Sequence, residues 1–174
     1  MAETVPLWSA DYFVFLALLV FSRGMDFLST WVATPHLVLE GNPIAKWLGW
    51  KWSALINPVI CMFCAMLPIP TVVVVTTSLL VAARNFQGAW LMRTLGEHNY
   101  RHWMSAQLAI GSRRLLILCL LAQTTLIAII GAGLVWFGGN LLVPAGVGLG
   151  LLVYAFAVLL YSLLSLARCS SRGG

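Results

Sequence analysis

Four long apolar stretches dominate this chain and restrict what it can fold into. They cover about residues 8–32, 53–83, 115–137 and 142–167, and a helix needs roughly 20 apolar residues to cross a bilayer. With 61% hydrophobic residues, 9% charged residues and a mean hydropathy of +0.94, the chain has too little polar surface for a water-soluble globule. The sequence therefore predicts an all-α, polytopic membrane protein: a single helical transmembrane domain over residues 1–174 with four transmembrane helices.

The second apolar stretch, residues 53–83, is about 10 residues longer than a bilayer span requires and contains Pro68-Ile69-Pro70. Proline inside a helix removes a hydrogen bond and bends or breaks the helix. Two interpretations follow: a single kinked helix, or a re-entrant hairpin of two short halves whose flanking loops lie on the same side. We expect the kinked helix, because four spans then leave both arginine-rich regions on one face.

Positive charge is concentrated in two regions of the chain. One lies between the second and third spans and the other closes the chain; together they comprise Arg84, Arg93, Arg101, Arg113, Arg114, Arg168 and Arg172. Cytoplasmic segments of membrane proteins carry an excess of Lys and Arg. We therefore expect a multi-pass protein of the bacterial inner (plasma) membrane with both termini and residues Arg84–Arg114 in the cytoplasm, and residues 35–51 outside.

The same segment, Arg84–Arg114, is predicted to contain an amphipathic helix between the second and third spans. Tyr100, Trp103 and Met104 alternate with Arg101 and His102 at helical spacing, which is typical of a helix lying on an anionic membrane surface. We expect the bilayer and its anionic head groups as partners of this segment, and no nucleic acid.

Asp26 and Arg23 stand inside the first apolar stretch, where charge is costly and indicates a site. Ser22, Asp26, Ser29 and Thr30 share one helix face, and Arg23 can pair with Asp26 three residues later. One interpretation is a structural ion pair that holds helices in register. The other is an outward-facing pocket in which Asp26 and Glu40 bind a cation or a polar lipid head group.

The candidate ligand-binding residues are Asp26, Thr30, His36, Glu40 and Asn42. The last three lie in the polar connection after the first span, which could fold back over Asp26. No complete catalytic signature accompanies them. We therefore assign no catalytic residue and expect no cofactor.

Part of the chain resembles a known group of proteins. Asp26 with Ser29-Thr30, then Glu40-Gly41-Asn42-Pro43 and Trp47-Leu48-Gly49, resembles small uncharacterised bacterial membrane proteins of about four helices. In those proteins an Asp and a Thr on the first helix precede a Glu-x-Asn-Pro at the start of the second. The resemblance covers about residues 20–60. It implies a cluster of Asp, Glu and Asn side chains, and no reaction, because no activity is established for such families.

Two histidines raise the hypothesis of a metal site. His98 and His102 are four residues apart, so one helix face could present both to an ion beside Glu97. The order of residues lacks the H-E-x-x-H pattern of zinc hydrolases. The alternative is that both histidines belong to the basic amphipathic helix at the membrane surface.

Cys61 and Cys64 form a C-x-x-C in the second stretch, a spacing used by thiol oxidoreductases. Membrane enzymes of that class also need cysteines in an outer loop, and the loops of this chain contain none. We expect these cysteines to behave as small apolar residues.

The last two spans are joined by the short turn Gly138-Gly139-Asn140, which predicts an antiparallel hairpin. Gly146 and Gly150 form a G-x-x-x-G that lets helix backbones approach closely. This face packs either within the chain or in a homo-oligomer.

These observations favour an inner-membrane protein without chemistry of its own, acting as an accessory or complex-forming subunit with an outward-facing cluster of Asp, Glu and Asn. One alternative is a membrane enzyme on a lipid-linked substrate, with Asp26 and Glu40 as acid and base. Another is a small oligomeric transporter, for which the proline break in residues 53–83 is the only support.

Overall fold

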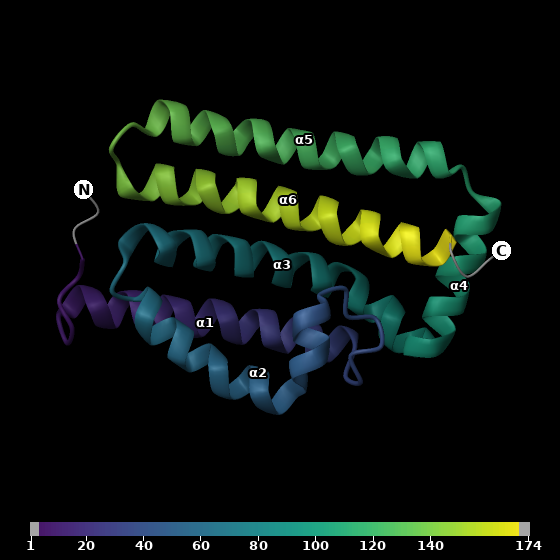
Figure 1. Ribbon diagram of the computed structural model, residues 1–174, viewed down its shortest axis with the longest axis horizontal. Helices are drawn as coiled ribbons and strands as arrows, with labels where there is room; N and C mark the ends of the chain where they lie inside the picture. Colours follow the sequence, from purple (N-terminus) through teal and green to yellow (C-terminus); the bar gives the residue numbers. More distant parts are fainter. Residues whose placement is uncertain (1–3, 171–174) are drawn as a thin grey trace.

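The structure is a computed structural model that describes residues 4–170 of the 174-residue chain. Within this range it consists of helices without strands: α1 (Ala10–Ala33), α2 (Pro43–Cys64), α3 (Pro68–Leu95), α4 (Glu97–Ile110), α5 (Arg113–Gly138) and α6 (Leu142–Ser170). The helices α1, α3, α6 and α5 lie side by side in that order (Figure 1), each packed on the next, and α2 lies against α1. Four of them, α1, α3, α5 and α6, are long and apolar enough to cross a membrane. These four apolar helices agree with the all-helical, multi-pass architecture predicted from the sequence.

Local sequence signals begin several of these helices. The side chains of Ser9 and Asn42 accept hydrogen bonds from the backbone N–H groups of Tyr12 (3.2 Å) and Ile44 (2.9 Å). Such caps satisfy donors that have no partner in the first turn of a helix. Pro43 follows its cap directly, at a position where the missing N–H costs nothing.

The prediction of one kinked helix over residues 53–83 is wrong. The chain leaves α2 at Cys64, turns, and starts α3 at Pro68. Because the first helical N–H groups have no intrahelical partner anyway, proline suits the first turn of a helix as well as it suits a kink. The turn is held by the Thr71 hydroxyl, which donates to the carbonyl oxygen of Cys64 at 2.7 Å. Of these two helices, α3 (Pro68–Leu95) is the one that is both long and apolar enough to cross a membrane.

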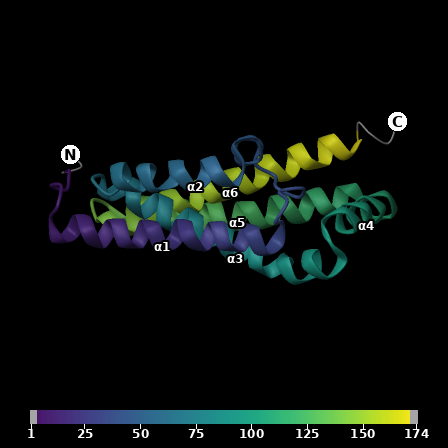
Figure 2. The same ribbon diagram turned by 90° about the horizontal axis from the view of Figure 1, so that it is seen from below.

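The turn between α2 and α3 adds one reversal of chain direction and so changes the end of the bundle at which each terminus lies. The N–H of Val5 donates to the carbonyl oxygen of Met66 at 2.9 Å, so the beginning of the described chain lies beside the α2–α3 turn. The start of α1 and the end of α6 lie at opposite ends of the bundle (Figures 1 and 2). The sequence predicted both termini on one side of the membrane, and residues 35–51 on the side opposite to the arginine-rich segment. The arrangement of the helices does not agree with either expectation.

A helix does lie between the second and third spans. It is α4, which lies across one end of the bundle (Figure 2). Its exposed side chains include the apolar Trp103 and Ile110 as well as Arg101. Contact of α4 with anionic lipid head groups stays a prediction.

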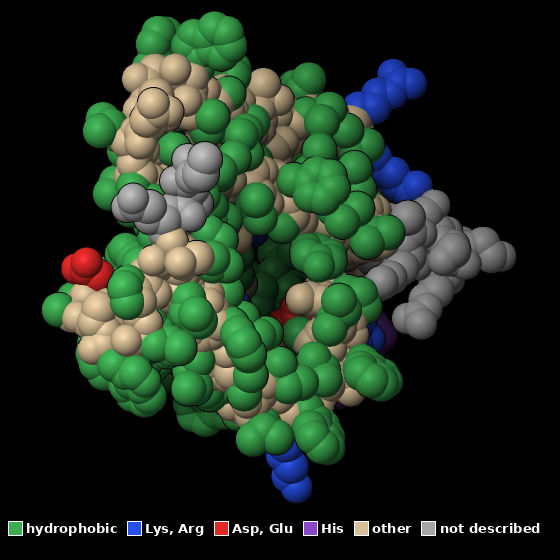
Figure 3. Space-filling view, turned by 60° about the vertical axis from the view of Figure 1, so that its left-hand side comes forward, with side chains coloured by type: hydrophobic (Ala, Val, Ile, Leu, Met, Phe, Trp, Pro, Cys, Tyr) green, Lys and Arg blue, Asp and Glu red, His purple; other side chains and the backbone are tan. Residues whose placement is uncertain are grey.

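The outside of the bundle is apolar. Large hydrophobic side chains such as Phe21, Trp136 and Phe156 are exposed, and hydrophobic side chains cover most of the face in Figure 3. Cys61, by contrast, is 3% exposed and packs with Tyr12 and Leu19. This thiol therefore fills space between helices, as a small apolar residue does.

The glycines of the G-x-x-x-G pack against α3 of the same chain. A Cβ atom added at Gly146 would lie 2.6 Å from Cβ of Val72, and one at Gly150 would lie 2.7 Å from Cβ of Thr76. The Thr77 hydroxyl donates to the carbonyl oxygen of Gly150 at 3.1 Å. This glycine face thus serves packing within the chain.

We predict that Gly150→Ala lowers the free energy of unfolding by about 1–3 kcal/mol, because the new methyl group overlaps side-chain and backbone atoms of α3. The matched control is Gly133→Ala on α5, where no atom lies within 4 Å of the added Cβ. Thermal unfolding of the purified protein in detergent measures both. Equal midpoints for the two variants would contradict the close packing of α6 on α3.

Candidate functional site

A cavity of about 580 Å³ lies between α1, α2, α3, α6 and the loop of residues 34–42. We call it the central pocket. Its polar lining comprises Arg23, Asp26, Thr30, Thr34, Glu40, Asn42, Ser53, Asn57, Arg84, Asn85, Tyr154, Tyr161, Ser162 and Ser165. The pocket opens as a hollow in the apolar surface, with acidic side-chain atoms visible at depth (Figure 3). A polar interior in a bundle with an apolar exterior is the main feature of this molecule.

Arg23 connects three helices at one side of the pocket. Its Nη1 lies 2.7 Å from Oδ2 of Asp26 on α1 and 3.3 Å from the Ser78 hydroxyl on α3. Its Nε donates to Oδ1 of Asn57 on α2 at 2.8 Å. The side chains of Arg23 and Asp26 are 30% and 18% exposed. This ion pair therefore neutralises two charges within the bundle and also positions α2 against α1 and α3.

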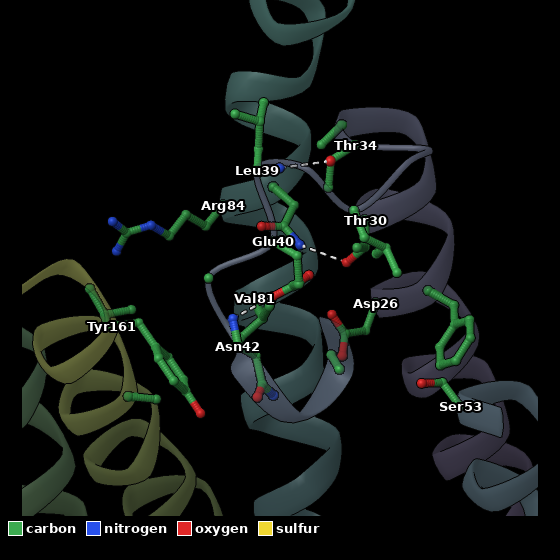
Figure 4. A pocket seen from close by; sticks show the side chains of 18 of the residues that line it. Asp26, Thr30, Thr34, Leu39, Glu40, Asn42, Ser53, Val81, Arg84 and Tyr161 are labelled. Atoms are coloured by element: carbon green, nitrogen blue, oxygen red, sulfur yellow. Dashed lines mark hydrogen bonds between the residues drawn. The ribbon is translucent and has the colours of Figure 1, made fainter. Parts of the chain in front are cut away.

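Two carboxylates face the interior of the pocket. Asp26 comes from α1 and Glu40 from the loop, and both point into the same space (Figure 4). Oε1 of Glu40 accepts a hydrogen bond from the N–H of Asn42 at 2.7 Å, while Oδ1 of Asn42 caps α2. Among the described residues, the second oxygen of Glu40 has no hydrogen-bond partner. Glu40 is therefore fixed in place with one oxygen free for another donor.

The opposite side of the pocket carries a basic group. Arg84 extends from α3 toward α6, on the side of Tyr161 (Figure 4). It forms no ion pair within the described part of the chain. Its neighbour Asn85 instead turns to α1, where its Nδ2 donates to the hydroxyls of Ser29 (3.3 Å) and Thr30 (3.2 Å). The pocket therefore holds acidic groups near α1 and an unpaired guanidinium near α6.

The loop of residues 34–42 covers one end of the pocket. Its backbone is held by the Thr34 hydroxyl, which accepts from the N–H of Leu39 at 3.1 Å. Trp50 of α2 donates its Nε1–H to the carbonyl oxygen of Pro35 at 2.8 Å. Leu37 has a φ of 56°, in the left-handed region that costs a branched residue energy. Contacts with the rest of the protein keep the loop in this conformation.

Glu97, the first residue of α4, supplies most of those contacts. Its carboxylate accepts hydrogen bonds from the Thr34 hydroxyl (2.6 Å) and from the N–H groups of His36 and Val38 (both 2.9 Å), and lies 3.0 Å from Nδ1 of His36. Arg101 adds a bond from Nη2 to the carbonyl oxygen of Val38 at 2.6 Å. Burial alone would raise the pKa of Glu97, but these hydrogen bonds outweigh it and lower the pKa to about 2.

We predict that this carboxylate makes the stability of the protein depend on acid pH. Because the folded state holds the pKa below the ordinary value of 4.5, the contribution is complete above that value and is lost as the pH falls toward about 2. Glu97→Gln should lower the free energy of unfolding by about 1–3 kcal/mol at neutral pH and flatten the acid limb of its pH profile. Thermal unfolding from about pH 7 to pH 3 measures both.

The matched control for this prediction is Asp11→Asn, which removes an exposed carboxylate at the other end of the bundle. It should leave the difference between neutral and acid midpoints close to that of the unchanged protein. A Glu97→Gln profile that follows the unchanged protein would contradict the role of Glu97 in holding the loop.

The predicted ligand residues do not all reach the pocket. Asp26, Thr30, Glu40 and Asn42 line it, whereas the side chain of His36 is 83% exposed and lies against Glu97 outside it. The loop turns at Leu37, so His36 and Glu40 project in different directions.

The histidines of α4 do not form a metal cluster with Glu97. His98 and His102 are exposed, and the carboxylate of Glu97 faces residues 34–38 instead. Over the described chain there is no group of three or more His, Cys, Asp or Glu side chains that could hold a metal ion.

Several pocket residues were missed by the sequence reasoning. They are Asn57, Arg84, Asn85 and Tyr161, together with Glu97, which holds the loop. The signal for Asn57 was the same as for Asp26, a polar side chain in an apolar stretch. Arg84 was assigned to the cytoplasmic segment because the second span was placed to end at residue 83.

No protein-family model matches this chain, and no significant match was found among curated proteins or solved structures. Function therefore has to be argued from the pocket itself.

Proposed function

We propose that this is an integral membrane protein that binds a membrane lipid or lipid-linked molecule, with the polar head group in the central pocket. In this proposal it acts in the bacterial inner membrane as an accessory or complex-forming subunit. The observation that carries it is a cavity of about 580 Å³ with charged and polar side chains in its lining, inside a bundle whose outer surface is apolar. A site of that size is typical for a small organic ligand or head group.

The opening of the pocket supports a ligand that arrives from the bilayer. α2 packs mainly on α1, and α6 packs on α3 and α5, so α2 and α6 form two walls with α3 behind them (Figures 1 and 2). The hollow between them lies on the side of the bundle. A side opening in an apolar surface lets acyl chains stay in lipid while the head group enters.

The depth of the pocket supports the same ligand. Asp26 precedes the end of α1, Ala33, by seven residues, which is about 11 Å at the helical rise. With the end of α1 at the membrane surface, this depth lies close to the boundary between head groups and acyl chains, because the head-group region adds about 5–8 Å on each side of the hydrocarbon core.

The enzyme alternative uses the same carboxylates, Asp26 and Glu40, as acid and base on a lipid-linked substrate. Its specific support is that both point into one space (Figure 4). Asp26 is engaged by Arg23, which favours a positioning role over proton transfer. The transporter hypothesis loses its basis, because Pro68 starts a helix rather than breaking one.

We further propose that the pocket end of the bundle faces the cytoplasm. The Lys and Arg residues described outside α1 lie in the half that carries the 34–42 loop and α4: Lys46, Lys51, Arg84, Arg93, Arg101, Arg113, Arg114 and, near the end of α6, Arg168. The other half, with Asp11 at its end, has none among the described residues. By the positive-inside bias this orientation places the start of the chain outside and opens the pocket in the cytoplasmic leaflet, in place of the outward-facing cluster expected from the sequence.

Cysteine labelling tests this orientation in whole cells. In a background with the native cysteines replaced by Ala, we predict that His36→Cys and His98→Cys are protected from a membrane-impermeant maleimide until the membrane is opened. Asn140→Cys, in the α5–α6 turn at the other end, should be labelled in intact cells. Labelling of His36→Cys and His98→Cys from opposite sides would contradict both the fold and the orientation.

Lipid retention tests the function. We predict that the detergent-purified protein carries a co-purifying lipid detectable by native mass spectrometry, and that Ala157→Trp, which fills the pocket from α6, removes it. The control is Val153→Trp on the exposed face of the same helix, which should retain the lipid. Equal retention by both variants would overturn the proposal.

A further inference from the structure

The charges of the central pocket do not cancel locally. Arg23 and Asp26 neutralise each other at 2.7 Å. This leaves Glu40, with one carboxylate oxygen free, and Arg84, which has no ion pair in the described chain. The pocket thus presents one unpaired negative group, the partly buried Glu40, and one unpaired positive group, the exposed Arg84, at its edge.

The two unpaired groups lie on different sides of the cavity. Glu40 lies near Asp26 and α1, and Arg84 reaches toward α6 and Tyr161 (Figure 4). Because both line one cavity of about 580 Å³, a ligand that satisfies both must carry a negative group and a positive group joined by a linker that fits within it. A guanidinium binds phosphate through charge-assisted hydrogen bonds, and a carboxylate accepts them from an ammonium group.

We propose that the central pocket takes a phosphoethanolamine head group, with the phosphate on Arg84 and the primary ammonium on Glu40 and the free oxygen of Asp26. This inference rests on the proposed lipid-binding function and names its ligand class. The head group is zwitterionic, so its two charges match the two unpaired charges of the site and add no net charge to it.

The acceptors of the site distinguish this head group from others. A primary ammonium has three N–H donors for Glu40 and Asp26, whereas a trimethylammonium has none and is bound by open aromatic faces. Of the aromatic rings in the lining, Phe27 and Trp50 pack on each other at 5.8 Å, and Tyr154 is only 5% exposed. This leaves Tyr161 alone, whereas a methylated ammonium is bound by a cage of several rings. A head group with only a phosphate would leave Glu40 unpaired.

The test measures lipid binding to the full-length protein in detergent by native mass spectrometry. The probes are phosphatidylethanolamine, phosphatidylcholine, phosphatidylglycerol and phosphatidic acid with identical acyl chains. We expect phosphatidylethanolamine to bind about tenfold more tightly than the others, the difference that one charge-assisted hydrogen bond supplies. This comparison uses the unchanged protein, so it does not depend on whether any variant folds.

Two variants then assign the contacts. Arg84→Gln should weaken all four lipids, because each has a phosphate, whereas Glu40→Gln should weaken phosphatidylethanolamine alone and abolish its preference. The control is Arg93→Gln, which removes an arginine of the same helix that lies over the Trp31 ring, 5.6 Å from its centroid, outside the pocket. It should leave the preference unchanged.

The remaining outcomes separate the phosphoethanolamine assignment from the proposed lipid-binding function. A preference for phosphatidylglycerol, phosphatidic acid or phosphatidylcholine that Ala157→Trp removes would overturn the phosphoethanolamine assignment and leave lipid binding in place. Binding of no lipid, or binding that Ala157→Trp does not affect, would overturn both. If free phosphoethanolamine competes with the lipid at equal concentration, the head-group assignment stands. The proposal that the natural ligand is a lipid is then overturned.

Discussion

The hydrogen bonds of Arg23 are the constraint on which the central pocket depends. A guanidinium inside a membrane bundle is tolerated only when its donors are satisfied by the protein. Here the partners are Asp26 on the same helix, Asn57 on α2 and Ser78 on α3. α2 has few other contacts with the bundle beyond α1. Displacing it would leave Arg23 with unmet donors, so this side chain helps to hold the wall that closes the pocket, together with the packing of Cys61 on α1.

The sequence was sufficient for features that depend on local chemistry. Apolar length alone predicted α1, α5 and α6 within a few residues, and helical spacing alone brings Arg23 to Asp26. It was insufficient at Pro68, because proline fits both a kink and a helix start. That single ambiguity changed the number of times the chain reverses direction, and with it the side assigned to every later loop.

The candidate site was predictable only in part for the same reason. Asp26 and Glu40 follow from their residue types and from the short connection between them. Arg84 and Tyr161 lie far apart in the sequence, on α3 and α6, and no local pattern relates them. Arg84 also belongs to the pocket lining only because α3 continues to Leu95. His36 was placed in the site by proximity in sequence, but the left-handed conformation of Leu37 separates the two halves of its loop.

The glycines of α6 pack one part of the bundle tightly. Gly146 and Gly150 bring the backbone of α6 close to α3, and Gly148 brings it close to α5, all in the first third of the helix. Beyond them Tyr154 and Tyr161 stand at the walls of the cavity, and α4 lies across that end (Figure 2). Backbones that approach this closely leave no room for a ligand between them. The polar cavity can therefore form only in the part of the bundle toward α4 and the 34–42 loop, and the glycines of α6 set how far it extends along the helix.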